Sequence, residues 1–119
     1  LILTNNLSVK YGHQTIDFPN LKLKQGEQVL LIGKSGSGKT TFLNLIGGLL
    51  TPHSGEVEID GHNIVSISNS KRDKFRGKNI GFIFQTPQFI QSLDVENNLL
   101  LTQYLVGAYD KNHIDSLLL

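Results

Sequence analysis

The 119-residue sequence contains no cysteine and no methionine. The lack of cysteine excludes a disulfide framework and any thiolate chemistry. Long apolar runs are also missing: none approaches the roughly 20 residues that a membrane-spanning helix needs, and no signal peptide opens the chain. Neither sign of charge dominates, because the formal net charge is only +1, so nothing favours nucleic acid as a partner. These absences predict a cytoplasmic protein.

The missing methionine extends to the first position, which is Leu1. The chain ends on three leucines, Leu117–Leu119, within a predicted helix, and the apolar face of such a helix needs a partner. A chain of this length suffices for one domain that buries roughly two-thirds of its unfolded surface. We therefore expect residues 1–119 to be one part of a longer protein.

The most informative stretch is Gly33–Thr40, which fits the phosphate-binding pattern G-x-x-x-x-G-K-[ST] at every fixed position. An apolar run at residues 28–32 predicts a buried strand before it, and an apolar helical pattern begins at Thr41. Glycines let such a loop turn tightly and point several N–H groups at one anion, and the positive end of the helix faces the same place. Lys39 would reach the β- and γ-phosphates, and the Thr40 hydroxyl would ligate Mg²⁺. A loop that merely turns the chain would explain the glycines but not the flanking elements.

The remaining pattern predicts an α/β fold. Residues 80–84 are a second buried apolar run, so a long crossover would join two strands of a parallel core sheet. Residues 56–60 alternate between carboxylates and apolar residues, which is typical of an antiparallel strand with one wet face, and Asp60-Gly61 is a hairpin turn signal. Strands are also predicted at residues 1–10, 14–18 and 21–24, and helices from the loop to Thr51-Pro52 and at residues 71–76, 95–106 and 111–119.

Two more residues could serve a nucleotide. Tyr11 stands at a strand-to-turn junction, where its ring could stack on a base or simply pack at the rim of the domain. Gln85 follows the second buried run, and ligands of parallel α/β sheets bind beyond the carboxyl ends of strands, so its amide could reach a metal ion or a water at the γ-phosphate. On the residues alone, Gln85 is more simply a polar residue that starts a loop. The basic cluster at residues 71–78 is interpreted as a solvated helix face without chemistry.

Five segments, in this order and spacing, resemble the N-terminal half of an ABC transporter ATP-binding domain. The loop alone is shared by many NTPases, but its combination with the S-G-x-hydrophobic strand and the F-Q segment is specific. The stretch from Phe84 to Asn97 is also similar to the subgroup that serves lipoprotein release and macrolide-type exporters. The five segments are Tyr11-Gly12, the loop 33–40, Leu49–Glu56, Asp60–Ile64 and Ile80–Gln85.

The resemblance implies a P-loop NTPase of the ABC ATPase type, with a parallel core sheet and an antiparallel β subdomain, of which residues 1–119 are the incomplete N-terminal part. Tyr11 matches the aromatic residue that stacks on adenine. Gln85 matches the glutamine that contacts Mg²⁺ and the attacking water, so Lys39 and Gln85 would be catalytic and Thr40 and Gln85 would hold the metal. ATP would be contacted by Tyr11 and by Gly33, Lys34, Ser35, Gly36, Ser37, Gly38, Lys39, Thr40 and Thr41.

The resemblance also implies two partners: a membrane-spanning transporter subunit that docks near Gln85 to Leu101, and a second ATP-binding domain in a head-to-tail dimer at the inner face of the membrane. The family's L-S-G-G-Q signature, second acidic strand, catalytic glutamate and switch histidine do not occur in residues 1–119. We therefore expect the complete protein to be an ABC-type ATPase and the 119-residue part alone to be inactive.

Two alternatives stay open. One is another P-loop enzyme, either a GTPase or a small-molecule kinase, although neither the D-x-x-G nor the N-K-x-D motif of GTPases occurs and no arginine-rich lid is visible. The other is a non-hydrolytic ABC-type nucleotide-binding module.

Overall fold

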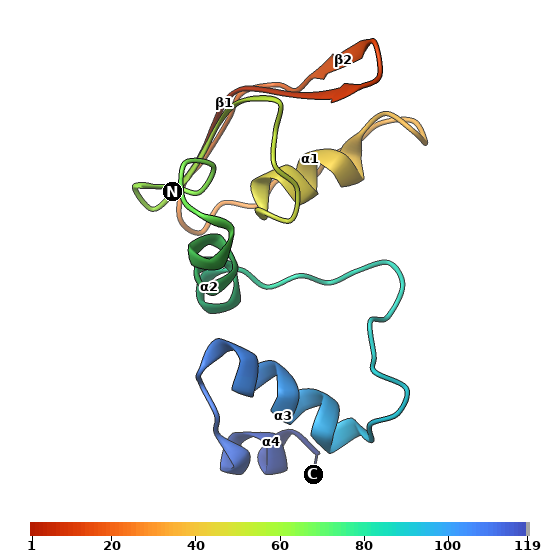
Figure 1. Ribbon diagram of the computed structural model, residues 1–119, viewed down its shortest axis with the longest axis vertical. Helices are drawn as coiled ribbons and strands as arrows, with labels where there is room; N and C mark the ends of the chain where they lie inside the picture. The colour runs from red at the N-terminus through yellow and green to blue at the C-terminus, as the bar shows by residue number, and fades with distance from the viewer. Residues whose placement is uncertain (119) are drawn as a thin grey trace. The chain divides into compact units, whose positions relative to one another are not determined.

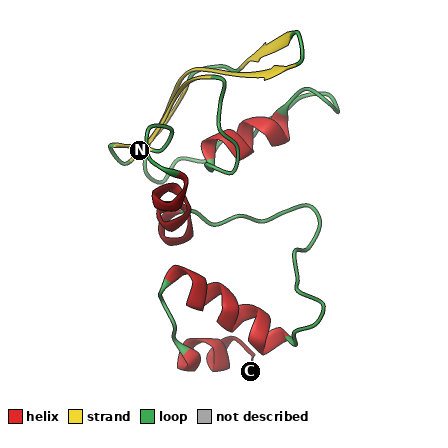
Figure 2. Ribbon diagram, viewed as in Figure 1, coloured by secondary structure: helices red, strands yellow, loops and turns green. Residues whose placement is uncertain are grey.

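The computed structural model of the chain describes residues 1–118 and divides into two compact units, Leu1–Asp73 and Lys74–Leu119 (Figure 1). The first unit contains a β-sheet and helix α1 (Lys39–Ile46). The second unit contains α3 (Val95–Val106) and α4 (Lys111–Leu118), and helix α2 (Asn69–Asn79) belongs partly to each unit. Figure 2 distinguishes the helices, strands and loops by colour. All the residues predicted to contact the nucleotide lie in the first unit, whereas Gln85, predicted to be catalytic and to hold the metal, lies in the second.

The strands of the first unit form one antiparallel sheet around the long strand β1. β1 pairs with β2 and β3 along one edge and with β4 along the other, and β5 adds a short pairing beyond β4. The strands predicted at residues 1–10, 14–18, 21–24 and 56–60 are thus confirmed to within two residues at each end. Their bounds are β1 Ile2–Tyr11, β2 Gln14–Asp17, β3 Leu21–Leu23, β4 Ser54–Ile59 and β5 His62–Asn63.

The core of this unit lies between the sheet and α1. Alternate residues at the end of β4 are buried, because successive side chains of a strand point to opposite faces. Figure 1 shows α1 alongside the sheet. Two of its side chains are buried. The buried apolar residues of this core are Leu7 and Val9 of β1, Val57 and Ile59 of β4, Phe42 and Leu45 of α1, and Ile64.

Helix α1 is shorter than predicted. The sequence predicts a helix from the loop to Thr51-Pro52, which would include Leu49 and Leu50, but the helix ends at Ile46. Gly48 follows with φ of 68°, a left-handed conformation that glycine adopts without steric cost and that terminates helices. Leu49 and Leu50 are therefore exposed rather than part of a packed helix.

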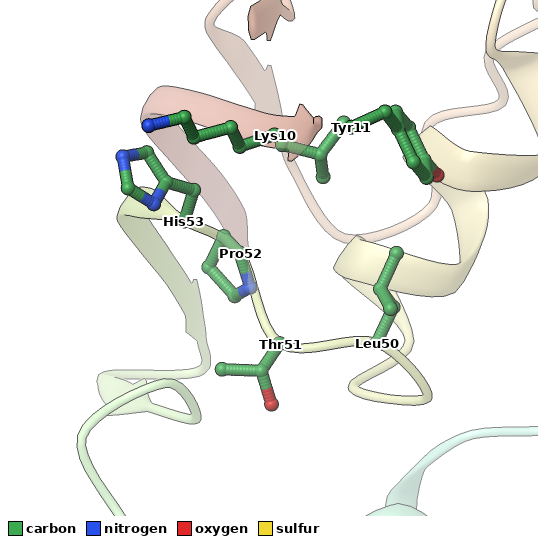
Figure 3. A pocket seen from close by; sticks show the side chains of 7 residues that line it. Lys10, Tyr11, Leu50, Thr51, Pro52 and His53 are labelled. Atoms are coloured by element: carbon green, nitrogen blue, oxygen red, sulfur yellow. The ribbon is translucent and has the colours of Figure 1, made fainter. Parts of the chain in front are cut away.

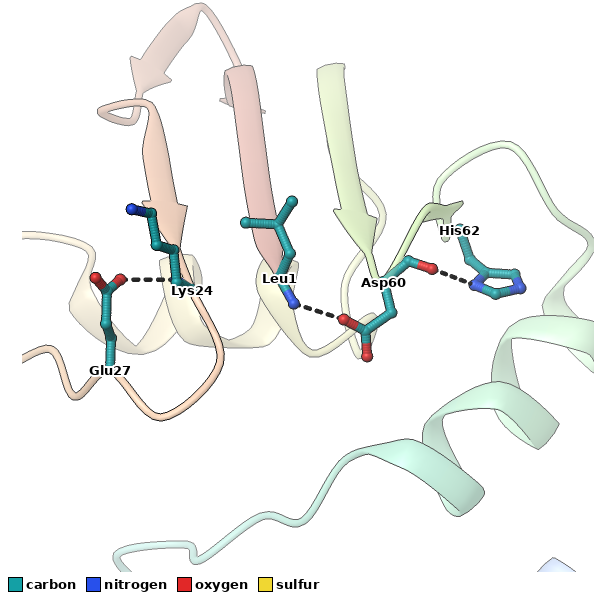
Figure 4. Close-up of polar contacts among 5 residues, drawn as sticks. All are labelled: Leu1, Lys24, Glu27, Asp60 and His62. Atoms are coloured by element: carbon teal, nitrogen blue, oxygen red, sulfur yellow. Dashed lines mark hydrogen bonds and ion pairs between the residues drawn. The ribbon is translucent and has the colours of Figure 1, made fainter.

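The ends of the strands are fixed by short polar contacts, which Figure 4 shows. Asp60 and Gly61 form the predicted hairpin turn between β4 and β5, with φ of 47° and 79°, the positive values that a type I′ turn requires. The amino group of Leu1 donates to the Asp60 carboxylate, and this hydrogen bond and its positive charge lower the pKa of Asp60. At the end of β3, the backbone N–H of Lys24 donates to Glu27 Oε2 at 2.7 Å.

The two predicted core strands are not strands in this chain. Neither residues 28–32 nor residues 80–84 pair with another segment among the residues that the structure describes. Leu30 and Ile32 are 80% and 86% exposed rather than buried. The second segment is nevertheless extended, because the rings of Phe82 and Phe84 stack 5.5 Å apart on one side of it. Their apolar sequence identifies segments that need burial, but a strand forms only where a partner accepts its hydrogen bonds.

The basic cluster also differs from the prediction. Arg72 is only 8% exposed, and its guanidinium donates to the carbonyl oxygens of Ile64, Val65 and Ile67 at 2.7, 3.0 and 3.2 Å. It also donates to Thr51 Oγ1 at 2.8 Å. The rigid fork of arginine donors makes such multiple bonding possible. Arg72 therefore ties the start of α2 to the loop that follows α1.

The second unit pairs α3 (Val95–Val106) with α4 (Lys111–Leu118), which confirms the two predicted helices. Asp94 caps α3 by accepting a hydrogen bond from Asn97 N at 2.8 Å, and Gly107, with φ of 71°, ends the helix. The Lys111 ammonium lies 3.2 Å from Glu96 Oε1, and this hydrogen bond raises the pKa of Lys111. Leu117 and Leu118 are exposed, whereas Leu119 lies outside the described residues. None of the helices in residues 1–118 is both long enough and apolar enough to span a bilayer.

Candidate functional site

The phosphate-binding loop predicted at residues 33–40 runs exposed into the first turn of α1. A turn within it is closed by Ser37 N donating to Lys34 O at 3.2 Å. Gly36 and Gly38 have φ of 77° and 90°, which residues with a side chain rarely adopt. Gly38, the second fixed glycine of the motif, therefore stands where the backbone conformation favours glycine, and so does Gly36, at a position that the motif leaves open.

Lys39 closes the loop from the helix side. Its ammonium donates to the carbonyl oxygens of Gly33 and Lys34, each at 2.7 Å, and lies 3.4 Å from Ser37 Oγ. A lysine ammonium has three donors, so these contacts hold the positive charge inside the curve of the loop. An anion that enters the loop would meet this charge directly.

The N-terminus of α1 points its donors at the same region. The first N–H group with an acceptor inside the helix is that of Phe42, which donates to Gly38 O at 2.8 Å. No side chain caps the N-terminus, where Gly38 is the N-cap residue. The preceding N–H groups, of Lys39, Thr40 and Thr41, thus have no acceptor within the helix, and the helix dipole adds partial positive charge. The Thr40 side chain is exposed in this turn.

An aromatic residue that the sequence analysis did not single out also reaches the loop. The ring of Phe18, just after β2, stacks on the ring of Phe42 with centroids 5.2 Å apart and planes 4° from parallel. An edge atom of the same ring, Cε1, lies 3.2 Å from the place where a Cβ on Gly38 would be. No sequence pattern pointed to Phe18, because its contacts join residues that are at least 20 positions apart.

Tyr11 ends β1 and is 55% exposed. It lines a cavity of about 250 Å³ together with Leu50, Pro52 and His53, as Figure 3 shows. None of the residues that line this cavity belongs to the loop 33–40. The ring is thus accessible for stacking, and both interpretations from the sequence stay compatible with its position.

Gln85 lies in the second unit, in an exposed stretch outside any helix or strand. The residues that follow it form an apolar groove of about 310 Å³, lined chiefly by Phe89, Ile90, Leu93, Val95 and Leu99. Phe89 is 71% exposed there. The groove belongs to the region for which docking of a membrane subunit was predicted.

Asn98 of α3 holds the wall of this groove. Its Oδ1 accepts from Ile90 N at 2.8 Å, and its Nδ2 lies 3.1, 3.0 and 2.9 Å from the carbonyl oxygens of Ile90, Leu93 and Asp94. The side-chain amide of Asn98 thus accepts one hydrogen bond from the backbone of residues 90–94 and donates others to it. Nothing in the sequence predicted this role of Asn98, since a single asparagine within a helical pattern gives no signal of its own.

Comparison with known proteins places these features in one family. Residues 16–118 match the ABC transporter family. BcrA, the bacitracin transport ATP-binding protein of Bacillus licheniformis, is 36% identical over 119 residues, which are 99% of this chain and 37% of BcrA. LolD, the lipoprotein-releasing system ATP-binding protein of Francisella tularensis subsp. holarctica, is 37% identical over 111 residues, which are 89% of this chain and 48% of LolD.

Comparison with solved structures points to the same family. Two dimeric structures of MJ0796, a bacterial ABC transporter cassette, match the chain with TM-scores of 0.84 and 0.83 at 35% and 34% identity. Each match covers 96% of this chain and 52% of the cassette, and the second structure is a post-hydrolysis state bound to ADP and Pi. The chain belongs to the ABC transporter family.

Membership of the ABC transporter family confirms the predicted fold class and decides against a GTPase or a small-molecule kinase. The similarity to LolD agrees with the predicted resemblance to the lipoprotein-release subgroup. The chain spans about half the length of the MJ0796 cassette and of LolD, and less of BcrA. The antiparallel sheet and the loop predicted to bind phosphate thus lie in the described part, whereas residues 28–32 and 80–84 form no parallel sheet within it.

Proposed function

We propose that this chain is the nucleotide-binding part of an ABC transporter ATPase and binds ATP with Mg²⁺ through the loop 33–40. The observation that carries the proposal is the convergence of the Lys39 ammonium and the unpaired N–H groups of α1 on one exposed loop. Phosphates are the ligands for which such a loop at a helix N-terminus is suited. In the bound state, Lys39 would exchange its bonds to Gly33 O and Lys34 O for bonds to the β- and γ-phosphates.

The other predicted residues take the roles that the family resemblance gives them. Thr40 presents an exposed hydroxyl in the first turn of α1, and an oxygen ligand of this kind suits Mg²⁺, which prefers a few protein oxygens together with phosphate and water. Gln85 would supply a further oxygen to the metal and orient the attacking water. Tyr11 would stack on adenine, which its exposed ring permits.

Hydrolysis is proposed for the complete protein. Lys39 and Gln85 position ATP, but the carboxylate base and the L-S-G-G-Q signature that the family uses do not occur in residues 1–119. MJ0796 is dimeric, and a head-to-tail dimer would bring the signature of one copy to the nucleotide of the other. The exposed apolar segments at residues 28–32 and 80–84 would then be covered by the rest of the cassette.

The membrane-spanning subunit of the transporter is the proposed occupant of the groove after Gln85. An exposed apolar groove is expected where a partner protein binds. BcrA and LolD are ATP-binding proteins of transport and release systems, and such systems need a component that crosses the membrane. The complete protein would accordingly lie on the cytoplasmic face of the membrane, attached through residues 85–101.

The test is MgATP binding by the full-length protein that carries this chain, measured by titration calorimetry with Lys39→Ala. The variant should lose measurable binding, because it removes the one cation held inside the loop. Lys22→Ala is the matched control, since Lys22 is an exposed lysine on β3 that takes no part in the loop. Equal affinity of the wild type and Lys39→Ala would contradict the assignment of the site.

Phosphate release by the same two variants separates an ATPase from the non-hydrolytic alternative. Turnover that is present in Lys22→Ala and absent in Lys39→Ala supports the ATPase. Tight MgATP binding without turnover, in the full-length protein together with its membrane subunit, would favour a nucleotide-binding module that does not hydrolyse ATP.

A further inference from the structure

We infer that Phe18 is a positioning residue for the phosphate-binding loop. The inference rests on the proposed function, because it assigns to Phe18 a role in nucleotide affinity through Gly38 and α1 rather than through contact with the nucleotide. Phe18 belongs to the link between β2 and β3, a segment without any phosphate-binding motif.

The backbone of this link is fixed to β1 by several hydrogen bonds. Phe18 N donates to Leu7 O at 2.9 Å, and Asn20 Oδ1 accepts from Asn6 N at 2.8 Å. The buried hydroxyl of Thr4 accepts from Leu21 N at 2.8 Å. Pro19 restricts the chain further, since its ring fixes φ. The position of the Phe18 ring is therefore set by the sheet.

The ring transmits this position to the start of α1. It lies flat on Phe42, whose N–H makes the first hydrogen bond of the helix, to Gly38 O. Its edge lies against Gly38 itself, the N-cap residue that holds the left-handed conformation between loop and helix. The Phe18 ring thus contacts both Gly38 and Phe42, the two residues whose hydrogen bond closes the first turn. Lys39 lies within this turn.

The physical consequence is preorganisation. A binding loop that is held in its bound shape loses less conformational freedom when the ligand arrives, so its affinity is higher. Removing the ring lets Gly38 and the first turn of α1 sample other conformations. Offset or parallel aromatic pairs contribute about 0.5–1.5 kcal/mol beyond their buried area, which corresponds to a ~2- to 13-fold change in an equilibrium constant.

The experiment measures the dissociation constants of ATP, GTP and tripolyphosphate, each with Mg²⁺, for the full-length protein. Phe18→Ala should weaken all three by a similar factor, roughly 2- to 13-fold, because the loop holds only the phosphates. Phe18→Leu, which keeps an apolar side chain against Gly38, should recover part of the affinity. Ile16→Ala is the matched control: it truncates an apolar residue on β2, two positions away, and should leave the three constants unchanged.

Three outcomes would overturn the inference. Weaker ATP and GTP with unchanged tripolyphosphate would mean that Phe18 contacts the nucleoside directly. A lower melting temperature with unchanged dissociation constants for the folded protein would mean that Phe18 only stabilises the fold, and Phe18→Leu answers this question if Phe18→Ala does not fold. An equal loss in Ile16→Ala would mean that any defect of the hairpin has the same effect. The proposed function fails separately, if the wild type does not bind MgATP or binds it no better than Lys39→Ala.

Discussion

Gly55 is the position where the structure makes the sharpest prediction about stability. It lies on β4 opposite an irregularity of β1, where the register shifts between Asn5 and Ser8 so that two residues of β1 face one residue of β4. Gly55 has φ of 93°, and a Cβ at this position would lie 2.4 Å from Asn6 O and 2.5 Å from Asn5 O. Both obstacles are backbone atoms, so a side-chain rotation cannot relieve the clash.

The cost of Gly55→Ala follows from two contributions. A residue with a Cβ in the left-handed region costs about 1–2 kcal/mol. To reach ordinary contact distance, the two strands must also separate by about 1 Å, which strains the neighbouring hydrogen bonds from His53 N to Ser8 O and between the Ser8 and Ser54 hydroxyls, each worth about 1 kcal/mol. We expect a total loss of about 3–4 kcal/mol in the free energy of unfolding, which is more than most single substitutions cost.

Gly61→Ala is the matched control. Gly61 also has positive φ, 79°, but no atom lies within 4 Å of the position of its Cβ. Only the backbone contribution applies, partly offset by the smaller entropy of the unfolded alanine chain, so the loss should be about 1 kcal/mol. Urea unfolding of the full-length protein, followed by circular dichroism, measures both. Equal destabilisation of the two variants would refute the argument that close approach of β1 and β4 requires glycine.

Four further predictions concern the site and its surroundings. Tyr11→Ala should weaken ATP and GTP alike, by roughly 1–3 kcal/mol, because a stacked ring reads no hydrogen-bonding edge; calorimetry with both nucleotides checks this. Asn98→Ala should speed hydrogen exchange at the Ile90 amide, which loses its acceptor, and Asn97→Ala should not. Arg72→Lys should destabilise the protein by about 1–3 kcal/mol in urea unfolding, because an ammonium cannot replace the fork and leaves buried carbonyls unpaired. Residues 1–119 expressed alone should release no phosphate from ATP, and turnover that Lys39→Ala abolishes would show that the part carries its own catalytic base.

The local features of the first unit were predictable from sequence because each depends on residues close together in the chain. Alternation at residues 56–60 and the Asp60-Gly61 pair specify a strand and a turn without reference to distant segments, and both were confirmed. The loop 33–40 is also local, since Gly36 and Gly38 adopt positive φ within a stretch of eight residues. The family resemblance depended on the order of several such segments along the chain. No single segment carries this information.

Features that depend on a distant partner were missed or wrong. Residues 28–32 have the composition of a buried strand, yet composition states a need for burial and does not identify the segment that provides it. Arg72 shows the converse case. As a charged residue in a basic cluster it was predicted to be solvated, but the five N–H donors of its guanidinium lie in one plane and bond to several backbone carbonyls of a neighbouring loop. The buried charge therefore keeps hydrogen-bond partners inside the fold.

Phe18 lies in a segment that was predictable from sequence, but its contacts with distant residues were not, and these contacts bear on the proposed function. From the sequence, Phe18 marks only the end of a short strand. In the structure, its backbone is hydrogen-bonded to β1 and its ring contacts Gly38, the N-cap residue of α1, and Phe42. The motif therefore specifies the shape of the loop, but residues outside the motif determine how firmly that shape is held. Since affinity for phosphates depends on both, two chains with identical loops can differ in nucleotide affinity through the residue at this position alone.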